Sequence, residues 1–217
     1  MSWSDCTKPH DMVATVSNGC GSMLTAIIAT FESERTLVPT LAALVPGAAA
    51  GLVAEVIIAD AGSRDATAEV ADIAGCRFMS SNDALGVRLK AAAATVRSPW
   101  LMFLRAGVIP QPGWIDAAGH FMQTTEQIGD AARAAVFRAP VKAGHVSPGL
   151  AEIVALVRSA LARGPDPDQG LLIARRFYEA VGGHPPAANA EAALLRRLGR
   201  GRTVMLPAAI VISCKDT

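Results

Sequence analysis

The sequence predicts an α/β fold in which helices flank a central, mostly parallel sheet. Two short apolar runs rich in β-branched residues, 24–30 and 54–59, are joined by about twenty helix-like residues, a pattern typical of a β-α-β unit. Hydrophobic residues make up 51% of the chain, much of it Ala, and aromatic residues only 5%, which favours helices packed closely on a sheet over a β-sandwich. With 217 residues there is room for one such domain, whereas two full domains would be crowded.

The first half of the chain alternates between predicted strands and helices. After the strand at 24–30, a helix is expected to begin at Glu32 or Ser33 and to run through Leu44, because Pro46 and Gly47 follow. Ser63 is a natural N-cap for a helix over 65–74. The other elements expected here are a strand at 76–79, a helix from 82 to about 96, a strand at 100–104 and a helix at 114–125.

The second half of the chain is less regular. Two Pro residues and a closing Gly predict a loop without regular structure over 164–170. The other expected elements are a weak strand at 131–139, helices at 150–162, 175–181 and 190–198, an apolar run at 171–174, and short strands at 203–206 and 209–213. No internal repeat or low-complexity linker interrupts this order, so we expect a single domain over 23–217.

Charge and metal-ligand spacing exclude several classes of protein. The net charge is +1, so no global field attracts nucleic acid or an anionic membrane. The four Cys and four His are scattered at spacings that match neither a zinc site nor a disulfide scaffold. Incidental thiols in a reducing compartment are the favoured interpretation.

The N-terminal residues 1–22 are predicted to be a mobile arm or an extension. They lack the charged start and continuous apolar core of a signal peptide. The chain also has no run of about 18 apolar residues, so no transmembrane helix is expected. We therefore expect a cytoplasmic protein whose membrane contact, if any, is peripheral.

Acidic residues follow the first two predicted strands. Glu32 comes after the first strand, Asp60 ends the second, and Asp65 closes the turn after it. Ligands of α/β sheets bind beyond the carboxyl ends of parallel strands, so these carboxylates are candidate ligand-binding groups. The alternative for Asp60 and Asp65 is that they cap the following turn and helix.

Several short motifs occur in a characteristic order along the chain. They are Thr-Phe-Glu-Ser-Glu at 30–34, Asp-Ala-Gly-Ser-Arg-Asp at 60–65, Trp-Leu-Met-Phe-Leu at 100–104, Pro-Gly-Trp at 112–114, Asp-Gln-Gly at 168–170, Arg-Arg-Phe-Tyr-Glu-Ala-Val-Gly-Gly at 175–183, and the segments 194–198 and 206–209. From about Met23 to Ser213 the chain thereby resembles the family 2 glycosyltransferases of the GT-A fold, and small bacterial members in particular.

The resemblance implies a site for a nucleotide-sugar donor. The base and ribose would lie against Thr30, Phe31, Glu32, Asp60 and Asp65, and Gly62 would let the backbone approach the ligand. Arg88 and Arg105 would meet the phosphates. The alternative for each is a solvated surface side chain, which is the commoner case.

An acceptor side is also implied, lined by Asp168 and Gln169. The acceptor classes that fit the resemblance are a glycan, a lipid-linked sugar and a small molecule. Nucleic acid is not among the expected partners.

One departure from the family concerns the metal. The family carries an acidic metal-binding residue after the strand at 101–104, and Gly107 stands at the matching position. Mg²⁺ or Mn²⁺ normally bridges protein carboxylate and substrate pyrophosphate, and glycine cannot ligate it. The resemblance implies Mg²⁺ or Mn²⁺ as cofactor, but Gly107 leaves three alternatives: other groups hold the metal, the metal is absent, or catalysis is lost. Arg105 is the candidate substitute at the pyrophosphate.

A second departure concerns the general base. The family's Glu-Asp pair is matched by Ala190-Glu191, so Glu191 would deprotonate the acceptor hydroxyl with a side chain one methylene longer. The alternative is an acid at a helix N-terminus, where the dipole favours it.

Two hypotheses follow. The first is an inverting glycosyltransferase, and the second is a catalytically degenerate member that serves as a nucleotide-binding or scaffold subunit. A nucleotidyltransferase-like enzyme is disfavoured, because the Gly- and Arg-rich signature expected at the first turn is missing.

Overall fold

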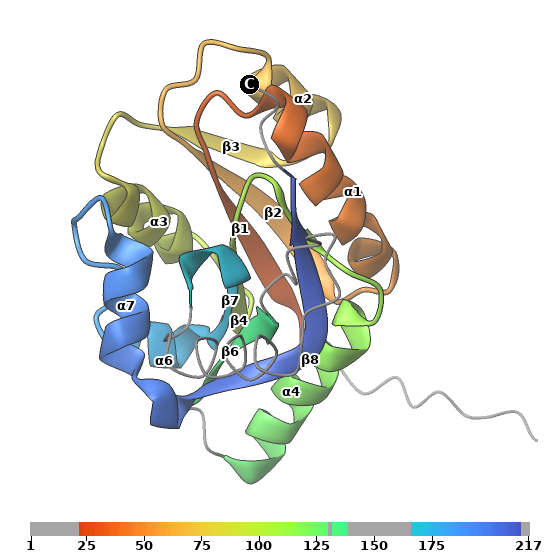
Figure 1. Ribbon diagram of the computed structural model, residues 1–217, viewed down its shortest axis with the longest axis vertical. Coiled ribbons are helices and arrows are strands. Elements are labelled where there is room, and N and C mark those ends of the chain that lie inside the picture. The colour runs from red at the N-terminus through yellow and green to blue at the C-terminus, as the bar shows by residue number, and fades with distance from the viewer. Residues whose placement is uncertain (1–21, 130–131, 139–165, 214–217) are drawn as a thin grey trace, which may run out of the picture.

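A computed structural model describes residues 22–129, 132–138 and 166–213 (Figure 1). The strands are β1 Leu24–Thr30, β2 Val53–Asp60, β3 Arg77–Ser80, β4 Trp100–Arg105, β5 Val108–Pro110, β6 Ala134–Arg138, β7 Leu171–Ala174 and β8 Thr203–Ile212. The helices are α1 Glu34–Ala49, α2 Thr67–Ile73, α3 Leu85–Ala94, α4 Trp114–Ile128, α6 Arg175–Ala180 and α7 Ala190–Leu198, with short 3-10 helices η1 Pro167–Gln169 and η2 Arg200–Arg202.

The strands form one sheet in the order β3-β2-β1-β4-β7-β6-β8-β5. Strands β1 to β4 are mutually parallel where they pair, which confirms the predicted β-α-β units and the mostly parallel sheet. Strand β7 runs antiparallel to β4 and β6, and β8 is parallel to β6 but antiparallel to β5.

Helices cover both faces of this sheet. In Figure 1, α1, α2 and α4 lie on one side, and α3, α6 and α7 lie on the other. Helix α1 packs on α2, β2 and β5, whereas α3 packs on β1, β2 and α7. This division follows from right-handed crossovers, since the chain moves outward from β1 to β3 and then returns to β4.

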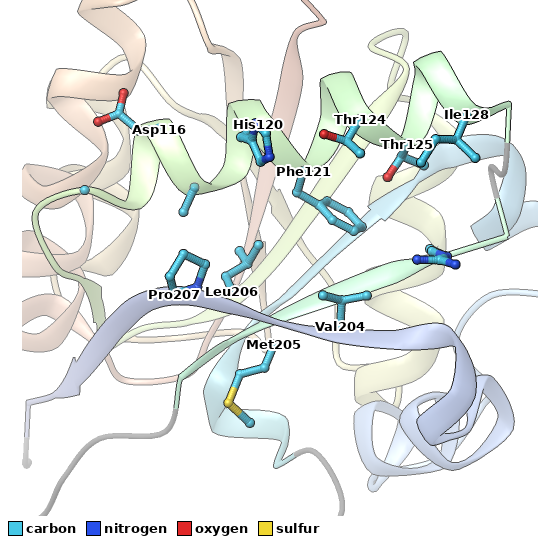
Figure 2. A pocket seen from close by; sticks show the side chains of 13 residues that line it. Asp116, His120, Phe121, Thr124, Thr125, Ile128, Val204, Met205, Leu206 and Pro207 are labelled. Atoms are coloured by element: carbon cyan, nitrogen blue, oxygen red, sulfur yellow. The ribbon is translucent and has the colours of Figure 1, made fainter.

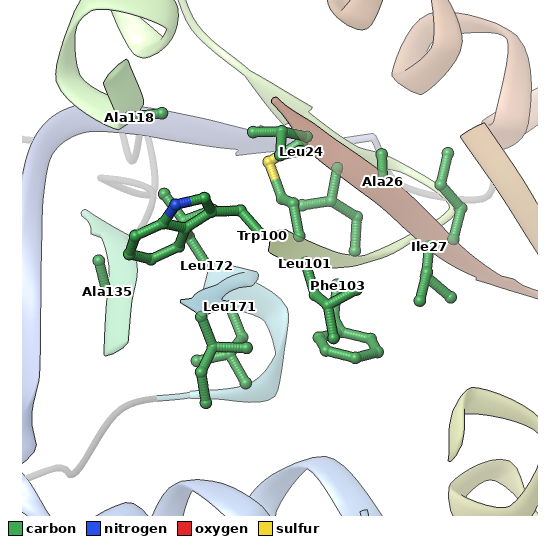
Figure 3. Close-up of a cluster of buried hydrophobic side chains, with 14 of the residues drawn as sticks. Leu24, Ala26, Ile27, Trp100, Leu101, Phe103, Ala118, Ala135, Leu171 and Leu172 are labelled. Atoms are coloured by element: carbon green, nitrogen blue, oxygen red, sulfur yellow. The ribbon is translucent and has the colours of Figure 1, made fainter. Parts of the chain in front are cut away.

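The core lies between the sheet and these helices (Figure 3). Leu24, Ile27, Trp100, Leu101 and Leu172 are at most 1% exposed. Each such side chain contributes about 1.5–3 kcal/mol when it leaves water. The apolar residues of β1 and β4 are buried except for the half-buried Ala29, as expected for a sheet covered on both faces.

Register brings the carboxyl ends of the central strands to one edge. Thr30 lies opposite Asp60, and Ala29 lies opposite Arg105. Thr30, Asp60 and Arg105 therefore meet at one edge of the sheet, although 30 to 75 positions separate them in the sequence.

Several predicted boundaries were wrong. Helix α1 continues past Leu44 and includes Pro46, whose missing N–H leaves only the carbonyl of the exposed Ala42 without its helical partner. The close packing of Gly47 under Trp114 keeps this part of the helix against the core: a Cβ at Gly47 would lie 2.6 Å from the indole.

Helix α2 begins at Thr67, two residues later than predicted, and Ser63 is not its N-cap. Residues 167–169 form a 3-10 helix rather than an irregular loop. The two short strands predicted at the C-terminal end are one strand, β8, with a register shift opposite β6, and β5 was not predicted.

Two predictions fall outside the described residues: the helix at 150–162 and the arm up to residue 21. Ser22, the last residue assigned to that arm, is described, and its hydroxyl donates to the Glu126 carboxylate. Within the described ranges, no helix combines the length and apolar character needed to cross a membrane.

Candidate active site

Two turns at the carboxyl ends of β1 and β2 are tied together by reciprocal hydrogen bonds. We call residues 31–34 and 60–67 the paired turns. The Glu32 N–H donates to Ser63 Oγ (2.9 Å), and the Arg64 N–H donates to Glu32 Oε1 (2.9 Å). The Ala66 N–H likewise donates to Glu34 Oε2 (3.2 Å). Carboxylates of one turn thus satisfy the backbone of the other.

The Asp60 carboxylate holds the second of these turns by accepting hydrogen bonds from its backbone. The side chain of Asp60 is 0% exposed. The carboxylate accepts hydrogen bonds from the Thr30 hydroxyl (2.8 Å), the Gly62 and Ser63 N–H groups (2.8 Å each), and the hydroxyls of Ser63 (2.5 Å) and Ser80 (3.2 Å). A ligand would reach this carboxylate only by displacing one of these donors.

The charge state of Asp60 follows from these partners. Burial alone would raise the pKa of this carboxyl, but hydrogen bonds from Ser63, Thr30 and Gly62 outweigh burial and hold the pKa below its ordinary value. Asp60 therefore has the capping role that the sequence left open, with an ionised carboxylate inside the fold, and Thr30 supports it as a hydrogen-bond donor.

Asp65 has a similar role at the other end of the paired turns. It accepts the Glu34 N–H (3.0 Å) and both the N–H (3.1 Å) and the hydroxyl (2.5 Å) of Thr67. Burial acts to raise its pKa, and the hydrogen bonds from Thr67 and Glu34 lower it further than burial raises it. Asp65 thus joins the beginning of α1 to the beginning of α2.

The surface of the paired turns that faces solvent comes from other residues. Phe31 is 57% exposed, and Glu32 has a φ of +47°, a left-handed conformation that costs energy for a non-glycine residue. Gly62 has a φ of +81°, and a Cβ there would lie 2.3 Å from Asn82 Oδ1. Asn82 was predicted only as a helix start, and no signal in the sequence places it over Gly62.

Arg88 lies beneath the same strand ends. From α3 its guanidinium donates to the carbonyl of Ala59, at a short contact, and to that of Thr30 (3.5 Å), while Nε donates to the Asp83 carbonyl (3.2 Å). Burial lowers the pKa of Arg88, and the nearby charges of Asp60, Asp83 and Glu191 act in the opposite direction. Arg88 therefore connects the paired turns electrostatically with Glu191.

A second cluster, which we call the Arg105 cluster, contains Arg105, Asp168 and Glu191. Arg105 ends β4, Asp168 lies in η1, and Glu191 is in the first turn of α7. Arg105 Nη1 contacts Asp168 Oδ1 at 3.0 Å, and Nε donates to Glu191 Oε2 at 2.7 Å. The Nη2 group binds the same Glu191 oxygen at a still shorter contact.

Burial differs sharply within the Arg105 cluster. The side chains of Arg105 and Asp168 are 39% and 44% exposed, whereas that of Glu191 is only 9% exposed. Burial raises the pKa of Glu191, and the hydrogen bond and charge of Arg105 offset only part of this increase. Burial lowers the pKa of Arg105, but Glu191 and Asp168 outweigh it and raise that pKa.

The two predicted acceptor-side residues are placed differently. Asp168 reaches the cluster, but Gln169 turns inward and is 4% exposed. Its amide accepts the Asp166 N–H (2.7 Å) and donates to the Phe137 carbonyl (2.9 Å). Gln169 thus completes the capping box of η1 and fixes this loop. The position of Gln169 does not support its predicted contact with the acceptor.

Gly107 is turned away from the Arg105 cluster. Its φ is +93°, and a Cβ would lie 3.2 Å from the Ser213 carbonyl oxygen and 3.6 Å from Thr36 Cβ. Its N–H donates to Thr40 Oγ1 (2.9 Å) and the Thr36 carbonyl (3.1 Å). An acid at 107 would be strained and crowded, whatever its value as a metal ligand.

The residues at this edge do not fit a divalent metal ion. The carboxylates of Asp168 and Glu191 are already bound by a guanidinium, which would repel a second cation. Among residues 22–129, 132–138 and 166–213, no three His, Cys, Asp or Glu side chains converge as a metal-binding group.

A buried histidine that sequence reasoning missed lies beside Glu191. His184 is 1% exposed, exchanges a hydrogen bond with the Tyr178 hydroxyl through Nδ1 (2.9 Å), and packs edge-on against Phe103. Burial lowers the pKa of His184 to about 3, so it is neutral. A small cavity is lined by both His184 and Glu191, and Nε2 has no hydrogen-bond partner in the described part of the chain.

A larger groove lies elsewhere, between α4 and β8 (Figure 2). It encloses about 500 Å³ and is lined mainly by apolar groups, including Phe121, Ile128, Val204 and Leu206. It shares no residue with the paired turns or the Arg105 cluster, and nothing in the described chain shows what would cover it.

Comparison with known structures identifies the fold. Glucosyl-3-phosphoglycerate synthase from Mycobacterium tuberculosis, in complex with Mn²⁺, UDP and glucosyl-3-phosphoglycerate, is 20% identical with a TM-score of 0.63 over 90% of this chain and 74% of that chain. Its complex with Mn²⁺, UDP and phosphoglyceric acid gives the same identity and TM-score over 90% and 72% of the two chains. A further mycobacterial protein is 21% identical, with a TM-score of 0.61 over 86% and 66%.

These similarities confirm the GT-A fold predicted from the sequence, since the described elements follow those of solved glycosyltransferases. A comparison with curated proteins finds no match. The sequence profile described as glycosyl transferase family 2 matches residues 25–155, which contain β1 to β6 and both paired turns. More than half of the chain thus fits that profile, and the chain belongs to glycosyl transferase family 2.

Proposed function

We propose that this chain transfers a sugar from a nucleotide-sugar donor to an acceptor hydroxyl with inversion, and that Glu191 is the general base. The observation that carries the proposal is the position of Glu191. It is a buried carboxyl with a raised pKa, at the sheet edge that also presents Arg105, Arg88 and the paired turns.

A raised pKa suits a general base, because basicity increases as the pKa approaches the working pH. In the proposed step the acceptor oxygen attacks the anomeric carbon, and the bond from that carbon to the diphosphate oxygen breaks. The bonding electrons leave with the diphosphate, and the hydroxyl proton passes to Glu191. The family's divalent ion would neutralise that leaving group, but the part of the chain that the structure describes offers it no set of ligands.

The donor side of the proposal rests on the paired turns. Phe31 presents an exposed ring for stacking on a base, and Glu32 and Gly62 lie on the same surface. Asp60 and Asp65 would act indirectly, by fixing the backbone that the nucleotide contacts. The family assignment and the UDP complexes of the similar structures support a nucleotide-sugar donor.

The acceptor side is assigned to Asp168. Its half-exposed carboxylate can accept hydrogen bonds from hydroxyl groups, which glycans, lipid-linked sugars and small polyols all offer. The phosphoglycerate acceptor belongs to the synthase of the similar structures and is not transferred to this chain.

Glu191→Gln tests the proposed base. We expect kcat for donor hydrolysis, in which water is the acceptor and nucleotide release from a panel of UDP- and GDP-sugars is measured, to fall by about 100-fold or more, because a general base contributes 10²–10⁴. Calorimetric binding of UDP or GDP should change far less than kcat, because the amide oxygen that replaces the carboxylate can still accept the Arg105 hydrogen bonds. In the wild type, kcat should fall as pH falls through a Glu191 pKa above the ordinary 4.5, since the protonated acid cannot accept a proton.

The matched control is Glu179→Gln, which alters an exposed glutamate of α6. It should leave turnover and binding as they are. Equal turnover in wild type and Glu191→Gln would reject the role of Glu191 as base.

A second function is favoured by one specific observation: two nitrogens of Arg105 bind the same oxygen of Glu191. A carboxylate held in this way is a poor proton acceptor, as in a catalytically degenerate subunit that binds nucleotide only. Nucleotide binding by the wild type with no release from any donor, at any pH, would favour this alternative.

A further inference from the structure

The Arg105 guanidinium supplies a positive charge at the edge of the sheet where a donor diphosphate is proposed to bind. This charge is part of the protein and does not depend on a bound metal ion. The guanidinium is held from two sides by acids that come from distant parts of the sequence, 63 and 86 residues further along. Because both contacts fix the guanidinium, its orientation is set before any ligand arrives.

The guanidinium keeps binding capacity despite these contacts. Arginine has five N–H donors, and the two carboxylates engage Nε, Nη1 and Nη2 once each. One N–H on each terminal nitrogen therefore remains, a pair suited to two phosphate oxygens. The side chain is 39% exposed, so the guanidinium is not sealed inside the fold.

Arg88 adds a second fixed cation. It donates to the carbonyls at the ends of β1 and β2, and its charge interacts with those of Asp60 and Glu191. Two guanidinium groups, from β4 and α3, thus act on one edge of the sheet. The similar synthase structures hold Mn²⁺ together with UDP, whereas the carboxylates here are already paired with Arg105.

We propose that Arg105 takes the place of the divalent metal ion at the donor diphosphate, so that this chain binds nucleoside diphosphates without metal. The inference rests on the proposed nucleotide-binding function. Asp168 and Glu191 act as positioning residues that aim the guanidinium at the phosphates, and Glu191 combines this with its proposed role as base.

The test is calorimetric titration of the full chain with UDP and with GDP, in EDTA and in Mn²⁺. We expect Kd values that agree within about twofold between the two conditions, because the cation is part of the protein. Tightening by more than about tenfold in Mn²⁺ would overturn the inference but leave the proposed function intact. Binding of neither nucleotide in either condition would overturn both.

Variants identify the cation. Arg105→Met should weaken diphosphate binding by about tenfold or more, leave uridine binding unchanged because uridine has no phosphate, and not be restored by Mn²⁺. Arg105→Lys should recover part of the loss through charge alone. Arg35→Met, at an exposed arginine of α1, is the matched control and should behave as wild type.

A double variant tests the same role of Arg105 if Arg105→Met alone fails to fold. Arg105→Met leaves Glu191 buried without its partner, so Arg105→Met/Glu191→Gln removes that charge and should show the same weakened binding. Wild-type affinity for UDP or GDP in this double variant would overturn the role of Arg105.

Discussion

The paired turns and the Arg105 cluster lie at the same edge of one sheet, yet they are stabilised in opposite ways. In the paired turns, carboxylates accept hydrogen bonds mainly from backbone N–H groups and hydroxyls, and the pKa values of Asp60 and Asp65 are lowered. In the Arg105 cluster, side chains bind side chains, and burial raises the pKa of Glu191.

This difference separates a rigid half of the site from an adjustable one. A carboxylate that satisfies several backbone donors cannot leave without breaking the turn, so Asp60 is part of the framework. The Arg105–Asp168 ion pair joins two half-exposed side chains and can be exchanged for contacts with a ligand at little cost, whereas Glu191 is buried. We therefore expect substitutions in the paired turns to affect folding and substitutions in the Arg105 cluster to affect binding and turnover.

The largest effect on stability is expected from Asp60→Ala. The change leaves buried donors of Thr30, Gly62 and Ser63 without an acceptor, and we expect the free energy of unfolding in urea to fall by about 3 kcal/mol. If that variant does not fold, Ser80→Ala removes a single donor and should cost about 1 kcal/mol.

The control for Asp60 is Asp72→Ala, at an exposed acid of α2. Its expected effect is within about 0.5 kcal/mol. A loss of less than 1 kcal/mol for Asp60→Ala, on the order of one ordinary hydrogen bond, would mean that the paired turns are no more rigid than the Arg105 cluster.

A smaller effect is expected from Arg105→Met, which leaves Glu191 buried without a partner. Removing one member of a buried pair costs about 3–5 kcal/mol, and because Arg105 is 39% exposed we expect about 2 kcal/mol. Asp168→Asn should cost less than about 1 kcal/mol, since that contact is half-exposed. Urea unfolding of both variants checks the order, and equal losses would contradict the difference in burial.

The smallest effect is a pH dependence of opposite sign in the two regions. Asp60 and Asp65 have pKa values below the ordinary 3.8 in the folded state, so their contribution is complete above that pH and is lost as pH falls through the lowered values. Glu191 has a raised pKa, so the stability it contributes below the ordinary 4.5 is lost as pH rises through the folded value.

Unfolding measured across pH separates these contributions. Asp60→Asn should flatten the acid limb below pH 3.8, and Glu191→Gln should remove the decline above pH 4.5. A Glu191→Gln variant whose stability declines with pH as the wild type does would show that this carboxyl is not the group involved.

Much of the fold was predictable because its signals are local. Strands β1, β2 and β4 are short apolar runs bounded by polar residues, and helix α7 was predicted with its observed bounds. The errors arose where tertiary contact decides. Gly47 under Trp114 helps keep α1 helical past Pro46, and pairing with β6 and β5 joins two predicted strands into β8.

The candidate site divides in the same way. Capping by Asp60 and Asp65 could be weighed from the sequence, since their main partners lie within a few residues or on the preceding turn. The pairing of Arg105 with Asp168 and Glu191 could not, because nothing local brings together residues so far apart in the chain. Gln169 was expected at the acceptor but binds the Phe137 carbonyl inside the fold, and Asn82, which was expected only to begin a helix, lies over Gly62. Both positions depend on contacts with segments distant in the sequence.

The pairing of Tyr178 with His184 gives the molecule a spectroscopic property. Tyr178 is the only tyrosine of the chain, and burial raises its pKa to about 12 from an ordinary 10. Its hydroxyl also accepts the His184 N–H (3.1 Å), which favours the phenolate and offsets only part of the effect of burial. Because burial keeps the phenol protonated below about pH 12, tyrosinate absorbance at a lower pH reports opening of the segment between α6 and α7, beside the proposed base.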